Sequence, residues 1–198
     1  MKIVACDEAG LAEVAAILNA GGVAVIPTDT VYGLAAHPAF PEAVSRLYTI
    51  KGREARKPIA LLAGDTAAAA RFLGGDLPPG VAALATRGWP GALTLVLPVQ
   101  GSAEGQYEGL RVPDHDWTRR LLAACGGVLR VTSANLSGQR AATDAPSALA
   151  EVGLSADIVV DDGISPGGVA STVLKIDNDG ACTVLREGPF KLGPGVER

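Results

Sequence analysis

Positive charge is concentrated in one short segment, "KGREARKP" at residues 51–58, of a chain that is acidic as a whole. The chain has 198 residues and a formal net charge of −4. The cations of the segment are Lys51, Arg53, Arg56 and Lys57. Arginine can hold phosphate oxygens with two N–H groups and lysine acts as a point charge, so the segment could bind a triphosphate. The alternative is a solvated helix end, where cations interact favourably with the helix dipole.

Three other segments place hydroxyl or amide side chains near an apolar stretch. They are "IPTDTVYGLA" (26–35), "VTSANLSGQRAATD" (131–144) and "DDGISPGGVASTVLKI" (161–176). Ligands of open α/β sheets bind beyond the carboxyl ends of the strands, so these segments could hold a small polar molecule. Glycine turns such as the one in the last segment can present N–H groups to an anion. Taken singly, the first segment is equally compatible with ordinary turn chemistry and the other two with flexible loops.

The sequence lacks the commonest nucleotide-binding and metal-binding patterns. It contains neither a GxxxxGK[ST] loop nor a GxGxxG turn after a strand, so ATP would need another architecture. Cys6, Cys125 and Cys182 show no CxxC spacing and there are two histidines, so we expect neither a disulfide framework nor a zinc site. The sequence shows no signal peptide and no apolar run of about 20 residues. We therefore expect a cytoplasmic protein that is soluble and has no membrane segment.

Periodic apolar patterns predict the elements that must position these segments. Strands are expected at residues 3–5, 23–27, 59–63, 93–98, 110–113, 128–134, 157–163, 171–176 and 182–186. Helices are expected at 8–19, from Pro41 to about Gly52, at 65–73, 78–86 and 115–124, and after Asp144. Hydrophobic residues make up 48% of the chain and charged residues 19%, which is typical of a globular protein. We expect one α/β domain over residues 1–198, with its core at about 8–190, around a mixed sheet.

Taken together, the polar segments resemble the YrdC family, the threonylcarbamoyl-AMP synthases. The matching motifs are "IPTDTVYGLA", "KGREARKP", "PGALTLVLP" (90–98), "LRVPDH" (110–115), "VTSANLSG" (131–138), "GGVASTV" (167–173) and "LREG" (185–188). They occur in the family's order, and they include its KxR pair (Lys51 and Arg53) and its SxN pair (Ser133 and Asn135). The resemblance implies a twisted, open α/β sheet with a concave, positive cavity, in the short form without a second domain.

The resemblance also implies an activity. L-threonine, bicarbonate and ATP, with Mg²⁺ and without a protein-bound metal, would give threonylcarbamoyl-AMP and pyrophosphate. That adenylate would feed the N6-threonylcarbamoyl modification of adenosine 37 in tRNA. Family members of this length depend on separate proteins for the transfer to tRNA, which in bacteria are TsaB, TsaD and TsaE.

Site residues follow from the same resemblance, position by position. The L-threonine side would be formed by Thr30, Tyr32, Arg111 and Ser171, with Thr28 nearby and Arg111 on the carboxylate. The ATP side would be formed by Lys51, Arg53, Lys57, Tyr107, Val131, Ser133, Asn135, Ala141 and Arg186, of which Lys51 and Arg53 would also serve catalysis. Leu62 occupies a place where some family members have histidine, so one polar contact to threonine is missing. His115 is expected to help start a helix, and segments 134–144 and 161–170 are candidate lids.

Two other functions remain open from the sequence. A non-catalytic module could bind double-stranded RNA through phosphate contacts, although the acidic composition and 4% aromatic residues argue against it. A related enzyme could carbamoylate a different substrate, although the intact KxR and SxN pairs argue for nucleotide chemistry. Pyrophosphate release with single amino acids would distinguish these possibilities.

Overall fold

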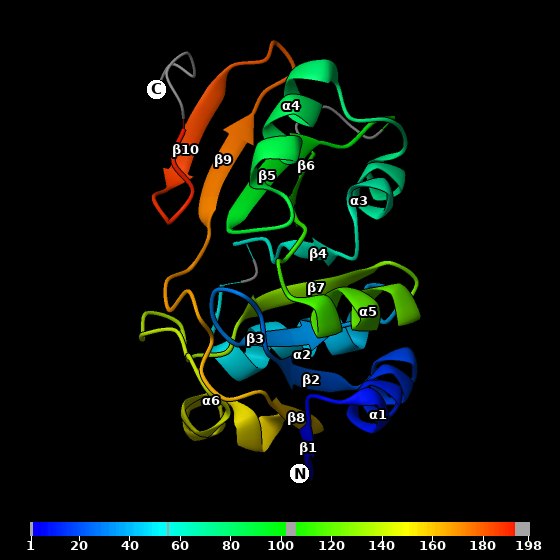
Figure 1. Cartoon of the computed structure of the whole chain (residues 1–198), viewed down its shortest axis with the longest axis vertical. Helices are drawn as coiled ribbons and strands as arrows, with labels where there is room; N and C mark the ends of the chain where they lie inside the picture. The colour runs from blue at the N-terminus through cyan, green and yellow to red at the C-terminus, as the bar shows by residue number, and fades with distance from the viewer. Residues whose placement is uncertain (1, 55, 102–105, 193–198) are drawn as a thin grey trace.

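In the described part of the chain, ten strands form one mixed sheet and six α-helices pack against it (Figure 1). The computed structural model describes residues 2–54, 56–101 and 106–192. The strands are β1 (Lys2–Ala5), β2 (Val23–Ile26), β3 (Gly33–Ala36), β4 (Leu61–Ala63), β5 (Leu93–Pro98), β6 (Tyr107–Arg111), β7 (Val128–Ser133), β8 (Ile158–Asp161), β9 (Thr172–Ile176) and β10 (Cys182–Arg186). The helices are α1 (Glu8–Asn19), α2 (Pro41–Lys51), α3 (Thr66–Leu73), α4 (Pro79–Gly88), α5 (Asp116–Ala124) and α6 (Ala145–Glu151), and a 3₁₀ turn follows at Gly153–Ser155. Within the described ranges, none of the helices has the length and apolar character needed to cross a membrane.

The strands are ordered β1-β8-β2-β3-β7-β4-β6-β5-β9-β10 across the sheet. Four neighbouring pairs are parallel, namely β1 with β8, β8 with β2, β4 with β6 and β5 with β9. The other neighbours are antiparallel, which makes the sheet mixed. The predicted α/β class with a twisted, open mixed sheet is therefore confirmed.

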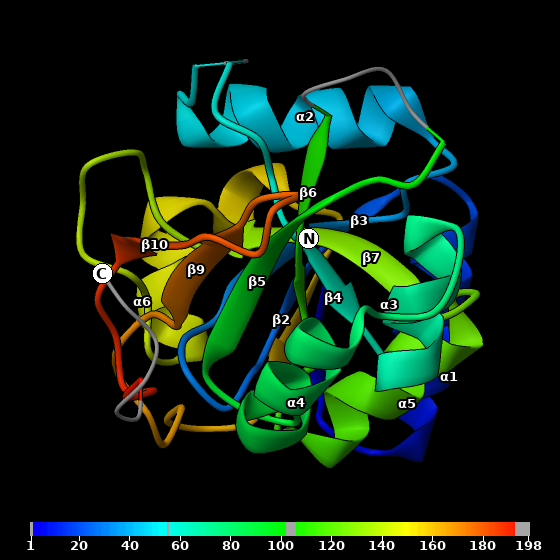
Figure 2. The ribbon, with the colours of Figure 1, turned by 90° about the horizontal axis from the view of Figure 1, so that it is seen from above.

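In the half of the sheet that contains β2 and β3, helices cover both faces. Along β2, Ala24 and Ile26 pack with α1 and α5, whereas Val23 and Val25 pack with α2 and α6. Figure 2 shows α2 on the opposite side of these strands from α1 and α5. Burial on both faces explains why this strand is a continuous apolar run in the sequence.

In the half that contains β5, β6 and β9, the core lies on one face. Leu93, Leu95 and Leu97 of β5 pack with α3 and α4. Thr94 and Val96, the alternate residues, point to the opposite face, where they line a cavity. The fold therefore leaves one face of the twisted sheet available as the floor of a site.

The predicted helices agree with the structure to within about two residues, and four strands differ. One of them is the strand predicted at 157–163, which is longer than β8 because β8 ends at Asp161. The sequence pattern does not predict β3, which follows β2 after the six-residue turn 27–32. The strand predicted at 59–63 is shorter in the structure, because β4 begins at Leu61. The predicted strand 110–113 is wrong in its bounds, because β6 begins at Tyr107 and ends at Arg111, before the proline at residue 113.

Candidate active site

A cavity of about 400 Å³ lies on the uncovered face of the sheet, which is within the size range of small-ligand sites. Residues from both halves of the sheet line it, so the site depends on the complete fold. The polar lining residues are Thr28, Thr30, Tyr32, Arg53, Thr94, Tyr107, Arg111, Thr132, Ser133, Ser171 and Arg186. The apolar lining includes Leu62, Val96, Val131, Val173 and Leu185.

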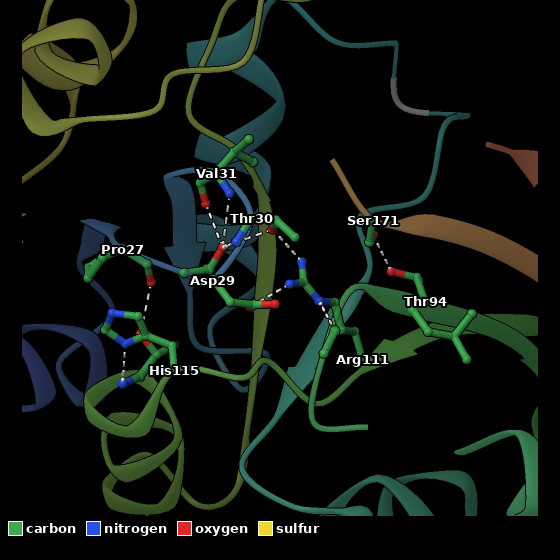
Figure 3. Close-up of polar contacts among 12 residues, drawn as sticks. Pro27, Asp29, Thr30, Val31, Thr94, Arg111, His115 and Ser171 are labelled. Carbon is green, nitrogen blue, oxygen red and sulfur yellow. Dashed lines mark hydrogen bonds and ion pairs between the residues drawn. The ribbon is translucent and has the colours of Figure 1, made fainter. Parts of the chain in front are cut away.

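The turn between β2 and β3 carries a directed chain of hydrogen bonds (Figure 3). The Thr28 hydroxyl donates to the Val31 carbonyl at 2.6 Å, so its oxygen can only accept from Thr30, 3.0 Å away. The Thr30 hydroxyl oxygen accepts in turn from Nη1 of Arg111 at 2.8 Å. The turn is therefore a preorganised unit that fixes the Thr30 oxygen against the Arg111 guanidinium.

Arg111, at the end of β6, is almost completely buried and is held on three sides. Its Nε donates to the Gly91 carbonyl at 2.8 Å, and its Nη2 forms an ion pair with Asp29 at 2.5 Å. Burial lowers the pKa of the Arg111 guanidinium, and the Asp29 carboxylate opposes that shift. A buried arginine with a single carboxylate partner is a fixed, oriented donor rather than a mobile surface charge.

Ser171 connects the sheet floor to a second arginine. Its hydroxyl lies 2.7 Å from the hydroxyl of Thr94, and its carbonyl accepts from both Nε and Nη2 of Arg186. Burial is the main cause that lowers the pKa of Arg186, followed by the positive charges of Arg111 and Arg53. Three arginines thus act on one another across a single cavity.

The cations of the basic segment 51–58 lie in three environments. Arg53 is at the cavity, Arg56 and Lys57 are exposed, and Lys51 is buried behind the cavity lining. Arg53 lines the cavity and is oriented by the carbonyls of Lys57 and Pro58, at 3.0 and 3.1 Å. Arg56 and Lys57 lie at exposed positions, where both pair with Glu54. In the described part of the chain, no ion pair is seen for Arg53 or Arg186, so their charges are available to an anion.

Lys51 does not line the cavity, and its side chain instead contacts the end of β7 and the segment that follows it. Its ammonium donates to the carbonyls of Ser133 and Asn135 at 2.5 and 2.6 Å, and to the Asn135 side-chain oxygen at 3.2 Å. The Asn135 amide nitrogen then bonds to the carbonyls of Leu136 and Gln139. Gly52 follows Lys51 in the left-handed region (φ 58°) and ends α2, so the chain can turn toward the cavity at Arg53.

We predict a specific pH dependence of stability from this buried lysine. Burial, with a contribution from the Arg53 charge, lowers the pKa of Lys51 to about 8, from the usual 10.5. Between these values the unfolded chain binds more protons than the folded one, so the free energy of unfolding should rise with pH relative to that of Lys51→Met. Urea denaturation of both proteins from pH 7 to 10 measures the difference, and parallel curves would contradict the prediction.

Segment 161–170 is hydrogen-bonded to the turn between β2 and β3 at several points. Asp162 N–H donates to the Tyr32 hydroxyl, which donates to the Gly163 carbonyl, both at 2.9 Å. Gly167 N–H donates to the Asp29 carbonyl, and a Cβ at Gly167 would come within 2.6 Å of that oxygen. Glycine is thus required here by a close backbone approach, and the segment is tied down at both ends in this structure.

Most of the residues expected in the site lie at the cavity, and four do not line it. Those that line it are Thr28, Thr30, Tyr32, Arg53, Tyr107, Arg111, Val131, Ser133, Ser171 and Arg186. Lys51 and Asn135 lie behind the wall and support it, whereas Lys57 is exposed and Ala141 is half-buried outside the lining. Leu62 lines the cavity and is paired in register with Arg111, so the wall beside this arginine is apolar.

Sequence reasoning missed two residues that shape the site. Asp29 neutralises Arg111, and Thr94 holds the Ser171 hydroxyl. Thr94 could have been found, because a threonine alternating with leucines in "LTLVLP" marks a strand whose other face is not core. The expectation that His115 helps to start a helix is confirmed, since it is the N-cap residue of α5 and its Nδ1 lies 3.3 Å from the backbone nitrogen of Thr118.

The fold and the cavity define an α/β protein with an arginine-lined cavity on the open face of a twisted sheet. The sequence profile of the Sua5/YciO/YrdC family, described as "Telomere recombination", matches residues 16–188. The chain belongs to this family, which confirms the resemblance found in its motifs.

Individual relatives support the assignment. A threonylcarbamoyl-AMP synthase of Bacillus subtilis (strain 168) is 34% identical over 176 residues, which are 85% of this chain and 51% of the relative. One from Alkalilimnicola ehrlichii is 37% identical over 161 residues, or 78% of this chain and 82% of the relative. The crystal structure of P. abyssi Sua5 complexed with L-threonine is 28% identical, with a TM-score of 0.85, over 95% of this chain and 58% of that one. The chain thus spans about half the length of the B. subtilis relative.

Proposed function

We propose that the protein is a threonylcarbamoyl-AMP synthase, which makes threonylcarbamoyl-AMP and pyrophosphate from L-threonine, bicarbonate and ATP. One observation carries the proposal. A buried, oriented polar unit of Asp29, Thr30 and Arg111 lies at the same cavity as Arg53 and Arg186, two arginines that form no ion pair among the described residues. Such a cavity suits a zwitterionic amino acid beside a polyphosphate.

The Arg111 unit would bind L-threonine. A guanidinium has five N–H groups, and three hydrogen bonds to Gly91, Thr30 and Asp29 leave two for a carboxylate. The Thr30 oxygen already accepts from Arg111 and can accept once more, from an ammonium or amine. Leu62 beside Arg111 offers no hydrogen bond, so the substrate hydroxyl would depend on other groups such as Ser171.

The remaining residues would form the ATP side. Arg53 and Arg186 would contact the phosphates, and Val131 and Ser133 line the same cavity and would contact the nucleotide. We assign Lys51 and Asn135 a positioning role, because their polar atoms hold segment 133–139 in place. Tyr107 would contact ATP at the cavity, while Lys57 and Ala141 could do so only from the outer edge.

In the proposed reaction, the threonine amine forms a carbamate either with bicarbonate, which loses water, or with dissolved CO₂, where the nitrogen loses a proton to solvent. A carbamate oxygen then attacks the α-phosphorus of ATP, and the bond to pyrophosphate breaks. Both reactants are anions, so the arginines must offset their repulsion and the charge that develops on the leaving group. Positioning supplies much of the rate enhancement, and we assign no nucleophile from the protein.

Mg²⁺ fits this site only together with ATP. The described lining residues include no carboxylate, and magnesium sites of this kind use substrate phosphates as ligands. The ion would neutralise phosphate charge when bound. The side chains of Arg53 and Arg186 would orient the same phosphates from the protein side.

The proposed product also implies a pathway role and protein partners. Threonylcarbamoyl-AMP would serve the modification of adenosine 37 in tRNA in the cytoplasm, with TsaB, TsaD and TsaE as functional partners. Binding of double-stranded RNA is not favoured as the main function, because Arg53 and Arg186 line a cavity rather than forming a broad surface stripe.

Pyrophosphate release tests the proposal against the alternatives. The protein would be incubated with ATP, Mg²⁺, bicarbonate and one amino acid at a time. Release that depends on L-threonine is the expected result. Release with a different amino acid would indicate another carbamoylation substrate, and salt-sensitive RNA binding without any release would indicate an RNA-binding module.

A further inference from the structure

Outside the cavity, three side chains of the kinds that bind metal ions lie together. The Cys6 sulfur, a His115 ring nitrogen and an Asp162 carboxylate oxygen are all within 4.8 Å of one another. Cys6 follows β1, His115 caps α5 and Asp162 follows β8, so widely separated parts of the chain contribute. This separation explains why sequence spacing gave no sign of the cluster.

The backbone segments that carry these side chains are fixed to one another. Cys6 N–H donates to the Asp161 carbonyl, which continues the pairing of β1 with β8. The Trp117 indole donates to the Asp7 carbonyl at 2.9 Å and so ties the first turn of α5 to the segment after β1. Rigid presentation of this kind is what a metal site requires of its scaffold.

The His115 ring has a partner that suits metal binding. The Thr118 hydroxyl donates to the Pro27 carbonyl at 2.8 Å, so its oxygen is left to accept from Nδ1–H of His115, 3.0 Å away. In that tautomer the Nε2 lone pair faces the Asp162 carboxylate oxygen at 2.9 Å, and a cation between them would relieve the repulsion. In the other tautomer Nδ1 accepts from Thr118 N–H at 3.3 Å and Nε2–H donates to Asp162. Figure 3 shows His115 beside Pro27.

We propose that Cys6, His115 and Asp162 form a binding site for one divalent metal ion of the zinc class. Ligands of a tetrahedral zinc ion stand about 3.3–3.8 Å apart, so the three atoms need only a small adjustment to enclose it. Asp162 is 39% exposed, which leaves a route of entry and room for water as the fourth ligand. A thiolate and an imidazole select zinc-like ions over Mg²⁺, so this site is distinct from any ion bound with ATP.

The same three residue types could also suggest a nucleophilic cysteine, but the surroundings oppose it. Burial and the neighbouring Asp162 carboxylate raise the pKa of the Cys6 thiol to about 12. The thiolate is the nucleophile in such chemistry, and here it would not form without a cation to replace the proton.

A hydrogen bond links the proposed metal site to a residue of the cavity lining. The backbone N–H of Asp162 donates to the hydroxyl of Tyr32, which lines the cavity wall. An ion on the Asp162 side chain would therefore hold this segment in the position seen here. Since a ligand that binds only the folded state stabilises it, Zn²⁺ should also raise the melting temperature.

Cobalt titration tests the site in the full-length protein. After chelator treatment and reduction of its thiols, the protein should bind one Co²⁺ per chain and develop a thiolate-to-Co²⁺ charge-transfer band, which Zn²⁺ abolishes. Cys6→Ser should lose the band, while the matched control Cys182→Ser, on β10, should keep it. Asp162→Asn, at a partly exposed position, should weaken Co²⁺ binding at least about tenfold.

Two results would overturn the proposal. One is the absence of a thiolate band in the wild-type protein at a several-fold excess of Co²⁺. The other is a band that persists in Cys6→Ser or disappears in Cys182→Ser. Both readouts are independent of enzymatic activity, so the metal site and the proposed synthase reaction can fail separately.

Discussion

Arg53→Ala should lower threonine-dependent pyrophosphate release by about 10²–10³-fold, the loss typical of removing one preorganised electrostatic contact in an active site. Arg53 lines the cavity without a carboxylate partner in the described residues, and only backbone carbonyls orient it. Its charge is therefore available to the phosphates. Steady-state kinetics with ATP as the varied substrate measures the effect.

Neighbouring cations of the same segment supply the controls. Arg56→Ala and Lys57→Ala remove charges that pair with Glu54 at exposed positions, so both should leave the rate within about threefold of wild type. Circular dichroism should show that all three variants remain folded. Near-normal turnover of Arg53→Ala, or an equal loss in all three variants, would contradict a specific role for Arg53.

Arg111→Ala should abolish measurable L-threonine binding, weaken ATP binding less, and destabilise the protein by about 3–5 kcal/mol. The stability loss follows because Asp29, 13% exposed, would be left as an unpaired carboxylate. Loss of the Nη1 donor would also release the Thr30 hydroxyl from its fixed position. Calorimetry with each ligand and urea denaturation measure the two effects.

A double variant separates binding from stability. Arg111→Ala with Asp29→Ala removes both charges, so it should recover much of the stability but none of the threonine affinity. Arg120→Ala, which breaks an exposed pair with Glu8, should leave the stability nearly unchanged. Normal threonine binding by the double variant would show that Arg111 is not the carboxylate ligand.

The sequence predicts the elements well where one physical signal dominates. Continuous apolar runs and helix caps located β2, β5, α1 and α5 to within about two residues. The strand β3 was missed because its four residues directly follow a turn rich in hydroxyl groups. Its strand conformation comes from pairing with β2 on one side and β7 on the other, which is tertiary information.

The candidate site could be predicted as a set of residue types, but not as an arrangement. Motif resemblance brought Arg53 and Arg111 into one proposed cavity, and the structure places both there. It gave no reason to expect that Lys51 would point to backbone carbonyls, because that contact depends on how segment 133–139 folds over α2. The sequence pattern around Asp29 is equally typical of a turn, and only the folded chain shows that this carboxylate faces Arg111.

Transfer of labelled carbon tests the central claim most directly. The protein would be incubated with ATP, Mg²⁺, L-threonine and ¹³C-bicarbonate, and the nucleotide products analysed by mass spectrometry. The expected product is threonylcarbamoyl-AMP with one ¹³C, in equal amount to pyrophosphate. Pyrophosphate accompanied by a threonine adenylate without ¹³C, or no threonine-dependent adenylate at all, would contradict the proposed function.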